Sequence, residues 1–420
     1  MPPVPPELVI GATPTAHFGA GAVTRLPGLA AAAGDRVLLV TDAALAATPV
    51  IGTVTALLRD AGLPVTVFDG VHPNPTTADV AAGAAAASGL GSGLGSGRPV
   101  VVAVGGGPPM DAAKGIALAA VNPQRGRALD YRGEFARPAL PLIAVPTTAG
   151  TGAETNAFGV VTDSDQHRKF YVGHSSTMPA AAILDPELTV GLPPGATAAT
   201  GMDALTHAVE SYPSVRANPW SAGLALHVLR IVGEFLPRAV ADGTDREARA
   251  QMLLAAHMAG LAMASTGLGA CHAIGHAIGG RFDVPHGVAL TMVLPQVLGF
   301  SQRAAAGRLA ELAFALGAGD TAAAAEVNAE SAVHAIASLA VSVGLTRRLA
   351  DFGIGRAEFD QIAAGALDDE VLANAPRQPT AADIGAILAS IADDHVNAEC
   401  LVADSPQTLQ DLSDRPGGCG

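Results

Sequence analysis

One segment of the chain, residues 99–114, limits the folds that are open to it. It reads PVVVAVGGGPPMDAAK. Its first part, Pro99–Val104, is entirely apolar, which is typical of a strand covered on both faces, as in a parallel sheet. The glycines at 105–107 end this strand, and Pro108 and Pro109 suit the first turn of a helix predicted over about Met110–Ala120. The segment therefore predicts a strand, a tight turn and a helix in an α/β layer structure.

The rest of the first half repeats this alternation. Strands are expected at about 36–40, 65–68 and 140–145, and helices at about 50–61 and 78–87. The alternation predicts an α/β domain of Rossmann-like type, a parallel sheet with helices on both faces. The Gly/Ser-rich segment Ser88–Gly97 is expected to be a surface loop.

The character of the sequence changes after about residue 192. Strand signals fade, and two prolines at 193 and 194 interrupt the chain. Ala/Leu-rich helical patterns follow, at about 198–211, 220–236, 246–265, 270–279, 304–316 and 381–391. We therefore expect an α/β domain over residues 1–192 and an all-helical domain over residues 193–420, with the ligand in the cleft between them.

Composition excludes several classes of protein. The formal net charge of −14 argues against nucleic acid or an anionic membrane as the main partner. Three cysteines are too few for a disulfide scaffold and favour a reduced, cytoplasmic setting. The first residues, MPPVPP, do not resemble a signal peptide. The apolar stretch Met252–Gly269 contains His257 and is expected to be a buried helix rather than a membrane span.

The glycine turn predicts a phosphate site. Glycines let the backbone approach a phosphate closely, and the following helix N-terminus offers free N–H groups to it. A second loop, residues 146–154 (PTTAGTGAE), follows the next buried strand and adds hydroxyl groups. The glycines do not form a G-x-G-x-x-G pattern, so a plain tight turn remains an alternative.

Asp42 ends the strand at 36–40, where an acidic side chain accepts hydrogen bonds from a ribose and repels a 2′-phosphate. This position favours NAD over NADP. An ordinary turn or N-cap aspartate is the alternative.

Histidines in the second half predict a metal site. Asp203 and His207 are four residues apart in a helical pattern, and so are His272 and His276. Each pair therefore shares one helix face. His286 follows in a Pro/Gly turn. One carboxylate and three or four imidazoles in an apolar domain suit a divalent metal, and these ligand types do not separate iron from zinc.

A dinucleotide site beside a metal that has no thiolate ligand points to hydride transfer to or from an alcohol carbon. The metal would polarise a carbonyl or stabilise an alkoxide, and the nicotinamide would carry the hydride. A nearby histidine that is not a ligand could relay the proton.

These motifs together resemble the iron-containing, or group III, alcohol dehydrogenase family over nearly the whole chain. The matching pieces stand in family order: Thr41-Asp42, Asn74-Pro75-Thr76, GGGPPMDAAK at 105–114, PTTAGTGAE at 146–154, Asp185-Pro186, TGMDALTHAVES at 200–211, HAIGHAIGGRFDVPHG at 272–287 and Pro376-Arg377.

The resemblance implies roles for individual residues. The metal ligands would be Asp203, His207, His272 and His286, holding Fe²⁺ in the first place and Zn²⁺ as an alternative. His276 would be the catalytic histidine near nicotinamide and substrate. The NAD(H) contacts would be Asp42, Asn74, Gly105, Gly106, Gly107, Asp111, Thr147, Thr148, Thr151 and Lys169. Lys114 falls on the family's lysine in the helix after the glycines. A homodimer or larger assembly is also implied.

The chain departs from the family pattern at two places. Pro108 stands where the family usually has Ser, which removes one hydroxyl contact to the pyrophosphate. Ala153–Asn156 reads AETN where Ser-Glu-Val-Thr is common.

Two other activities therefore stay open beside interconversion of a small alcohol and its aldehyde or ketone. The stretch GGRFDVPH at 279–286 is similar to maleylacetate reductases, which reduce an unsaturated oxo-diacid. Such an activity would need cationic pocket residues such as Arg281. A dehydroquinate synthase-like lyase is a more distant alternative, because it needs several basic residues for a phosphorylated substrate.

Overall fold

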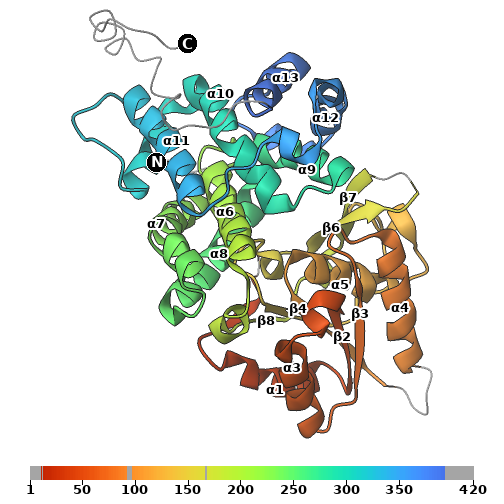
Figure 1. The fold of residues 1–420 in the computed structure, drawn as a ribbon. Helices are drawn as coiled ribbons and strands as arrows, with labels where there is room; N and C mark the ends of the chain where they lie inside the picture. The colour runs from red at the N-terminus through yellow and green to blue at the C-terminus, as the bar shows by residue number, and fades with distance from the viewer. Residues whose placement is uncertain (1–10, 12, 92–96, 166–167, 393–420) are drawn as a thin grey trace, which may run out of the picture.

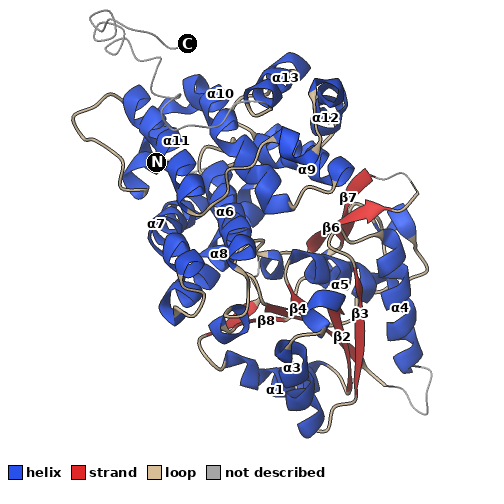
Figure 2. Cartoon of the chain, in the orientation of Figure 1, coloured by secondary structure: helices blue, strands red, loops and turns tan. Residues whose placement is uncertain are grey.

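The computed structural model describes residues 11, 13–91, 97–165 and 168–392. Figures 1 and 2 show a sheet flanked by helices at one end of the molecule and a group of helices at the other. The predicted fold class is confirmed: a parallel α/β part precedes an all-helical part. The predicted C-terminal extension of the helical domain beyond residue 392 lies outside the described residues.

A single six-stranded parallel sheet forms the core of the first part. Its strands, in spatial order, are β1 (Thr15–Phe18), β8 (Ala181–Leu184), β5 (Leu142–Pro146), β4 (Pro99–Gly105), β2 (Arg36–Asp42) and β3 (Val65–Val71). Sequence periodicity missed the two four-residue strands, β1 and β8, because such short runs carry little pattern.

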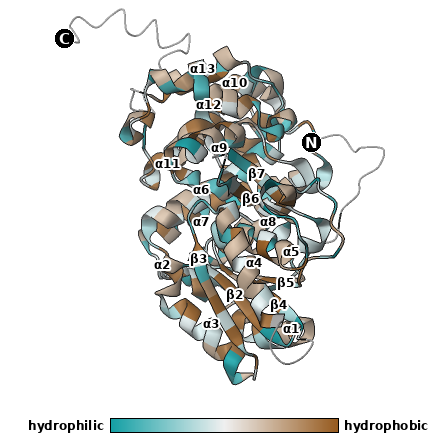
Figure 3. Ribbon diagram, turned by 90° about the vertical axis from the view of Figure 1, so that its right-hand side faces the viewer, coloured by the Kyte–Doolittle hydropathy of each residue, from teal (hydrophilic) through white to brown (hydrophobic). Residues whose placement is uncertain are grey.

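The central strands have no polar face because both faces are covered. Val37 and Leu39 face one apolar layer, which includes α1 (Leu26–Ala33) and α3 (Pro49–Asp60), and Leu38 and Val40 face the opposite layer. That second layer includes α4 (Thr77–Gly91) and α5 (Gly107–Ala119). The middle of β2 is hydrophobic, as Figure 3 shows. Ser88–Gly91 belongs to α4, so the loop predicted there is wrong for these residues; 92–96 lie outside the described residues.

The order of the strands places a crevice at their carboxyl ends. From β2 the chain runs outward to β3, then returns through α4 to β4 on the other side of β2. Ligands of open α/β sheets bind at such a switch point. Asp42 ends β2, at the N-terminus of the short helix α2 (Ala43–Ala46), and Gly105 ends β4.

An antiparallel hairpin, which the sequence patterns did not predict, connects the sheet with the helical part. It consists of β6 (Phe158–Asp163) and β7 (Arg168–Gly173). It packs on α5, and the Lys169 side chain on β7 lies beside Gly279 and Gly280 of α9. The hairpin therefore carries residues of the first half to the helices of the second.

The second part is built from eight α-helices among the described residues. They are α6 (Pro194–Ser211), α7 (Pro219–Ala241), α8 (Arg246–Thr266), α9 (Ala270–Phe282), α10 (His286–Ala315), α11 (Ala325–Ser342), α12 (Phe359–Leu367) and α13 (Ala381–Ser390). The predicted helix at 304–316 is only the end of α10, which begins at His286 and contains Pro295. The helix is irregular at Ala305, and this break lies close to the predicted start.

No single helix among the described residues is long and apolar enough to cross a membrane. The pair α8 and α9 passes such a test by length and composition only, with a bend of 106° between the two helices. Most of the apolar side chains of the predicted buried stretch, Met252–Gly269, are buried in the helical core.

The loop after β5 brings the backbones of the two parts into close contact, at Gly150 with Thr200 of α6 and at Gly152 with α8. A Cβ atom added to Gly152, in the loop after β5, would lie 2.6 Å from Gly260 Cα of α8. Beside this contact the buried Glu154 carboxylate lies 2.9 Å from His257 Nδ1 of α8. Two glycines thus allow the loop and the helix to touch, and a buried polar pair reinforces the contact.

Lys114 fixes the chain that leads into the hairpin. The side chain is fully buried in α5, and its Nζ donates to Ala153 O (2.7 Å), Asn156 Oδ1 (2.9 Å) and Phe158 O (2.5 Å). Burial lowers the pKa of Lys114 to about 8. The lysine therefore supports the segment between β5 and β6 from inside the protein and is not exposed in the crevice.

Replacing Lys114 with Met should lower the free energy of unfolding by about 3 kcal/mol, because three buried acceptors lose their donor. Urea unfolding followed by circular dichroism measures this. Arg230→Met, at an exposed position of α7, is the control and should change the value by less than about 0.5 kcal/mol. A Lys114→Met protein as stable as the parent would contradict this role.

Candidate metal centre and coenzyme crevice

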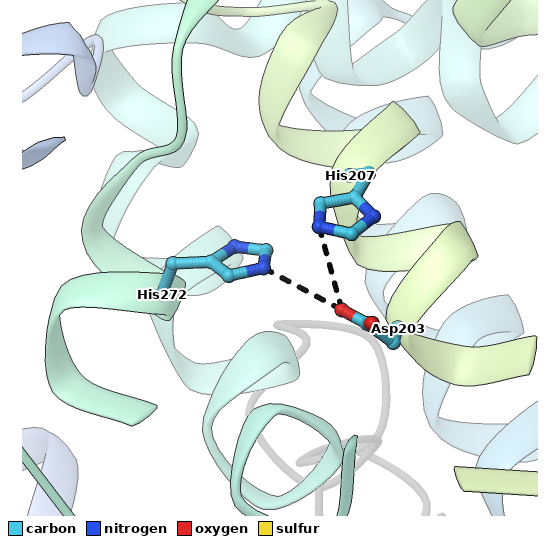
Figure 4. A group of neighbouring side chains, drawn as sticks. All are labelled: Asp203, His207 and His272. Atoms are coloured by element: carbon cyan, nitrogen blue, oxygen red, sulfur yellow. Dashed lines mark ion pairs between the residues drawn. The ribbon is translucent and has the colours of Figure 1, made fainter. Parts of the chain in front are cut away.

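Three helices bring four of the predicted ligands to one point. Asp203 and His207 lie on one face of α6, His272 lies in the first turn of α9, and His286 is the first residue of α10. The Nε2 atoms of His207 and His272 are both 3.5 Å from Asp203 Oδ1, and that of His286 is 3.6 Å from it. Figure 4 shows two of the imidazoles pointing toward the Asp203 carboxylate.

The donor set fits a metal ion. One ligand atom from each of Asp203, His207 and His272 lies within 4.8 Å of the others, and all three residues are buried. His286 is not part of this group of three, although its Nε2 approaches the same carboxylate oxygen. Asp203 Oδ1 and His272 Nε2 are buried without a hydrogen-bond partner, a costly state that a cation would relieve.

The protonation of three of these groups agrees with ligand roles. The exception is His272: burial alone would lower its pKa, but the Glu210 and Asp203 carboxylates raise it to about 9, so a metal would have to displace its Nε2 proton. Burial lowers the pKa of His207 and of His286, which favours neutral imidazoles with a free lone pair. Burial alone would raise the pKa of Asp203, but the surrounding histidines lower it, so the carboxylate stays ionised.

Glu210 is a site residue that the sequence reasoning missed. Its Oε2 lies 2.6 Å from His272 Nδ1 and accepts from Gly269 N at 2.9 Å, while its Oε1 accepts from Cys271 N at 2.6 Å. Burial would raise its pKa, but His272 and these N–H groups lower it. An ionised Glu210 therefore holds the Nδ1 proton of His272, so Nε2 is the atom that would bind a metal once its own proton is displaced. The signal was present, since Glu210 follows His207 by three residues on the same helix.

His276, the predicted catalytic histidine, also has a carboxylate partner. Its Nδ1 lies 2.8 Å from Asp369 Oδ2, and Asp369 Oδ1 lies 3.4 Å from the Tyr171 hydroxyl. Burial lowers the pKa of His276. Asp369 was not predicted, because it lies 93 residues away along the chain with no motif around it. The pair orients the ring and leaves Nε2 of His276 available for proton transfer.

The predicted phosphate loops lie against each other. Gly105 has a φ of +152°, and its carbonyl accepts from Thr147 N at 3.0 Å. A Cβ on Gly106 would come within 3.2 Å of Thr148, and one on Gly107 within 2.9 Å of Thr151. Pro108 and Pro109 stand in the first turn of α5, as predicted. The glycine turn and the threonine loop therefore form one surface at the carboxyl ends of β4 and β5.

Three predicted coenzyme residues lie in the region between the sheet and α9. Asp111 accepts from Val160 N at 3.1 Å, and burial raises its pKa to about 6. Burial lowers the pKa of Lys169, beside which lie the carboxylates of Asp111 and Asp283. Asn74 donates to Asp283 Oδ1 at 3.1 Å, so it reaches from the α/β part to the end of α9.

Asp42 faces the same crevice from β2, where its carboxylate accepts from Leu45 N at 2.9 Å. It is thus an N-cap, the alternative considered from the sequence, and this contact uses only one of its two carboxylate oxygens.

Comparison with known proteins agrees with this architecture. The model of the family described as "Iron-containing alcohol dehydrogenase" matches residues 13–186, and the model for the family's C-terminal part matches residues 197–392. The chain belongs to the iron-containing alcohol dehydrogenase family.

Individual relatives cover most of the chain. Alcohol dehydrogenase 4 of Schizosaccharomyces pombe is 39% identical over 84% of this chain and 81% of its own length. The NAD-dependent methanol dehydrogenase of Bacillus methanolicus is 36% identical over 92% of this chain and 98% of its own. A solved 1,3-propanediol oxidoreductase superposes with a TM-score of 0.83 and 34% identity, over 90% of this chain and 98% of that one. This protein is accordingly an enzyme of an oxidoreductase family that interconverts alcohols and aldehydes.

Asp369→Asn should lower the pKa of His276 further, because the Asp369 carboxylate opposes the effect of burial on this imidazole. Histidine NMR titration measures the midpoint. Asp368→Asn is the neighbouring control, since Asp368 pairs with Arg168 at the surface and should leave the midpoint in place. An unchanged midpoint in Asp369→Asn would mean that the pair does not control this histidine.

Proposed function

We propose that this enzyme interconverts a small alcohol and its aldehyde or ketone, using NAD(H) and one divalent metal ion. The observation that carries the proposal is the convergence of three imidazole Nε2 atoms on one buried oxygen of Asp203, within 3.6 Å. Asp203, His207, His272 and His286 would hold the ion. Fe²⁺ is the first choice because of the family, and Zn²⁺ has suitable ligand chemistry.

The coenzyme would lie across the crevice at the carboxyl ends of β2 and β4. Backbone N–H groups of Gly105–Gly107 and hydroxyls of Thr147, Thr148 and Thr151 would contact the phosphates. Asp42 would accept from the ribose, and Asn74, Asp111 and Lys169 would contact the part nearer to α9. The similarity to the NAD-dependent methanol dehydrogenase of Bacillus methanolicus supports NAD as the coenzyme.

When bound, the metal supplies Lewis-acid polarisation of an oxygen, and the nicotinamide supplies the hydride chemistry. The chain itself positions and exchanges protons. Asp369 keeps the Nδ1 proton of His276 in place, so Nε2 is the atom that gives a proton to, or takes one from, the reacting oxygen. Glu210 keeps His272 oriented, and burial of His276 excludes bulk water from the proton path.

The proposal also includes the setting of the enzyme. Low cysteine content supports a cytoplasmic location, and the family resemblance supports a homodimer or larger homo-oligomer. A small-molecule alcohol or aldehyde is the expected partner, without nucleic acid or membrane. Maleylacetate reduction is tested as an arm of the same assay.

Metal removal should abolish NADH oxidation at 340 nm with aldehydes, ketones and oxoacids, and reloading with Fe²⁺ or Zn²⁺ should restore it. Asp203→Ala and His272→Ala should weaken metal affinity by at least about 100-fold, since loss of a group that only hydrogen-bonds to a ligand already costs about 10–100-fold. Elemental mass spectrometry of the purified variants should then find less bound metal. His227→Ala, on the exposed face of α7, is the control. Turnover that survives without metal, or is confined to maleylacetate, would overturn the proposal.

Replacing Asp42 should relax the preference for NADH over NADPH, because a negative charge no longer faces the 2′-phosphate. The ratio of kcat/KM for the two coenzymes should shift about tenfold toward NADPH, equivalent to roughly 1.4 kcal/mol. Asp42→Asn keeps an N-cap acceptor and Asp42→Gly removes it, so a charge effect appears in both. An unchanged ratio in both variants would leave Asp42 as a capping residue alone.

A further inference from the structure

A cavity of about 270 Å³ lies between the hairpin and the helical part. Phe158 of β6 and Tyr171 of β7 form one side, and Met263 of α8 with Leu268 forms another. The remaining lining residues come from four other segments of the chain: Tyr131, Arg216, Gly267, and Glu370, Val371 and Asn374 of one 3-10 turn.

The cavity adjoins the candidate catalytic histidine. The hydroxyl of its wall residue Tyr171 lies 3.4 Å from Asp369 Oδ1, and the other oxygen of Asp369 lies 2.8 Å from His276 Nδ1. Glu370 and Val371 directly follow Asp369 in the chain, and Leu268 comes just before α9, which carries His276. The wall of the cavity is therefore linked to His276 through Asp369, the carboxylate that orients its ring.

The walls of the cavity are apolar and aromatic. The rings of Tyr131 and Phe158 meet the ring of Tyr171 edge-to-face, with centroids 6.2 and 5.8 Å apart. Met263, Leu268 and Val371 add aliphatic surface. Ring edges and faces arranged in this way favour an apolar or aromatic guest.

The polar groups of the lining are mostly engaged with other groups. Asn374 Nδ2 donates to Leu268 O at 2.9 Å, and the Glu370 carboxylate lies 3.7 Å from the Arg132 guanidinium. Arg216 is exposed and adds a cationic side chain to the lining. Apart from it, the polar side chains of the lining are mostly paired with other groups of the protein and offer little to a short, hydroxylated substrate.

A substrate of two or three carbons leaves part of this volume unfilled, since a three-carbon diol has only five non-hydrogen atoms. The unfilled remainder would hold water against apolar walls. A larger apolar group would displace this water and gain the free energy of burial.

We infer that this cavity receives the carbon body of the substrate, and that the enzyme prefers alcohols and aldehydes with a bulky apolar body, such as a phenylalkyl group, to those of two or three carbons. This inference rests on the proposed function and names its substrate class. Such substrates are larger and less polar than methanol and 1,3-propanediol, after which two of the relatives are named.

The first experiment compares 3-phenylpropanal with propanal in NADH oxidation by the metal-loaded enzyme. The ratio of kcat/KM should favour 3-phenylpropanal by at least about tenfold, since even one methylene in an apolar pocket changes specificity by about tenfold or more. A ratio of one or less, with both aldehydes turned over, overturns this inference and leaves the proposed function intact. No turnover of either aldehyde contradicts the proposed function itself, and with it this inference.

Two variants test whether the cavity is the cause. Val371→Phe fills it and should reduce the ratio to below one third of the parental value. Val341→Phe makes the same substitution on the exposed face of α11 and should leave both the ratio and the activity unchanged. Tyr131→Ala is the second cavity variant, in case Val371→Phe does not fold. Tyr131 is a wall residue that is 40% exposed, so the protein should tolerate its truncation, and the ratio should fall here too. An unchanged ratio in both cavity variants would overturn the inference.

Discussion

A single buried carboxylate oxygen organises the helical half of this enzyme. Helices α6, α9 and α10 each direct an imidazole toward Oδ1 of Asp203, which has no hydrogen-bond donor of its own. An ionised carboxylate is costly to bury unless positive charge compensates it. The packing of these helices is therefore compatible with a cation at their meeting point, and the ionised Glu210 behind His272 adds a second carboxylate that fixes the geometry.

The α/β half contributes a rigid platform for this centre. The central strands are apolar on both faces, so the sheet is buried by helices and its functional groups are confined to the carboxyl edge. At that edge the turn at Gly105–Gly107 touches Thr148 and Thr151, while Lys114 holds the chain beneath. The hairpin then extends from the platform to the helices. Chemistry at the crevice depends on both halves.

Local pattern predicted much of the fold and part of the site. Apolar runs gave the positions of β2, β4 and β5, and the four-residue spacing placed Asp203 beside His207 and His272 beside His276 on common helix faces. Asp369 could not be found in this way, because its contact with His276 exists only after distant segments have packed. The hairpin and the true start of α10 at His286 were not predicted for a related reason. The strands of the hairpin and a helix that begins after a proline depend on tertiary packing more than on periodicity.

The contact between Gly152 and Gly260 has a consequence for how the molecule unfolds. The sequence divides into two parts of different composition, but here their backbones touch, and the buried pair of Glu154 and His257 crosses the same junction. Separating the parts would break the buried Glu154–His257 pair. It would also open the close backbone contact that the two glycines allow. The loop after β5 therefore belongs to the same cooperative unit as helix α8, so loss of order in either part spreads to the other.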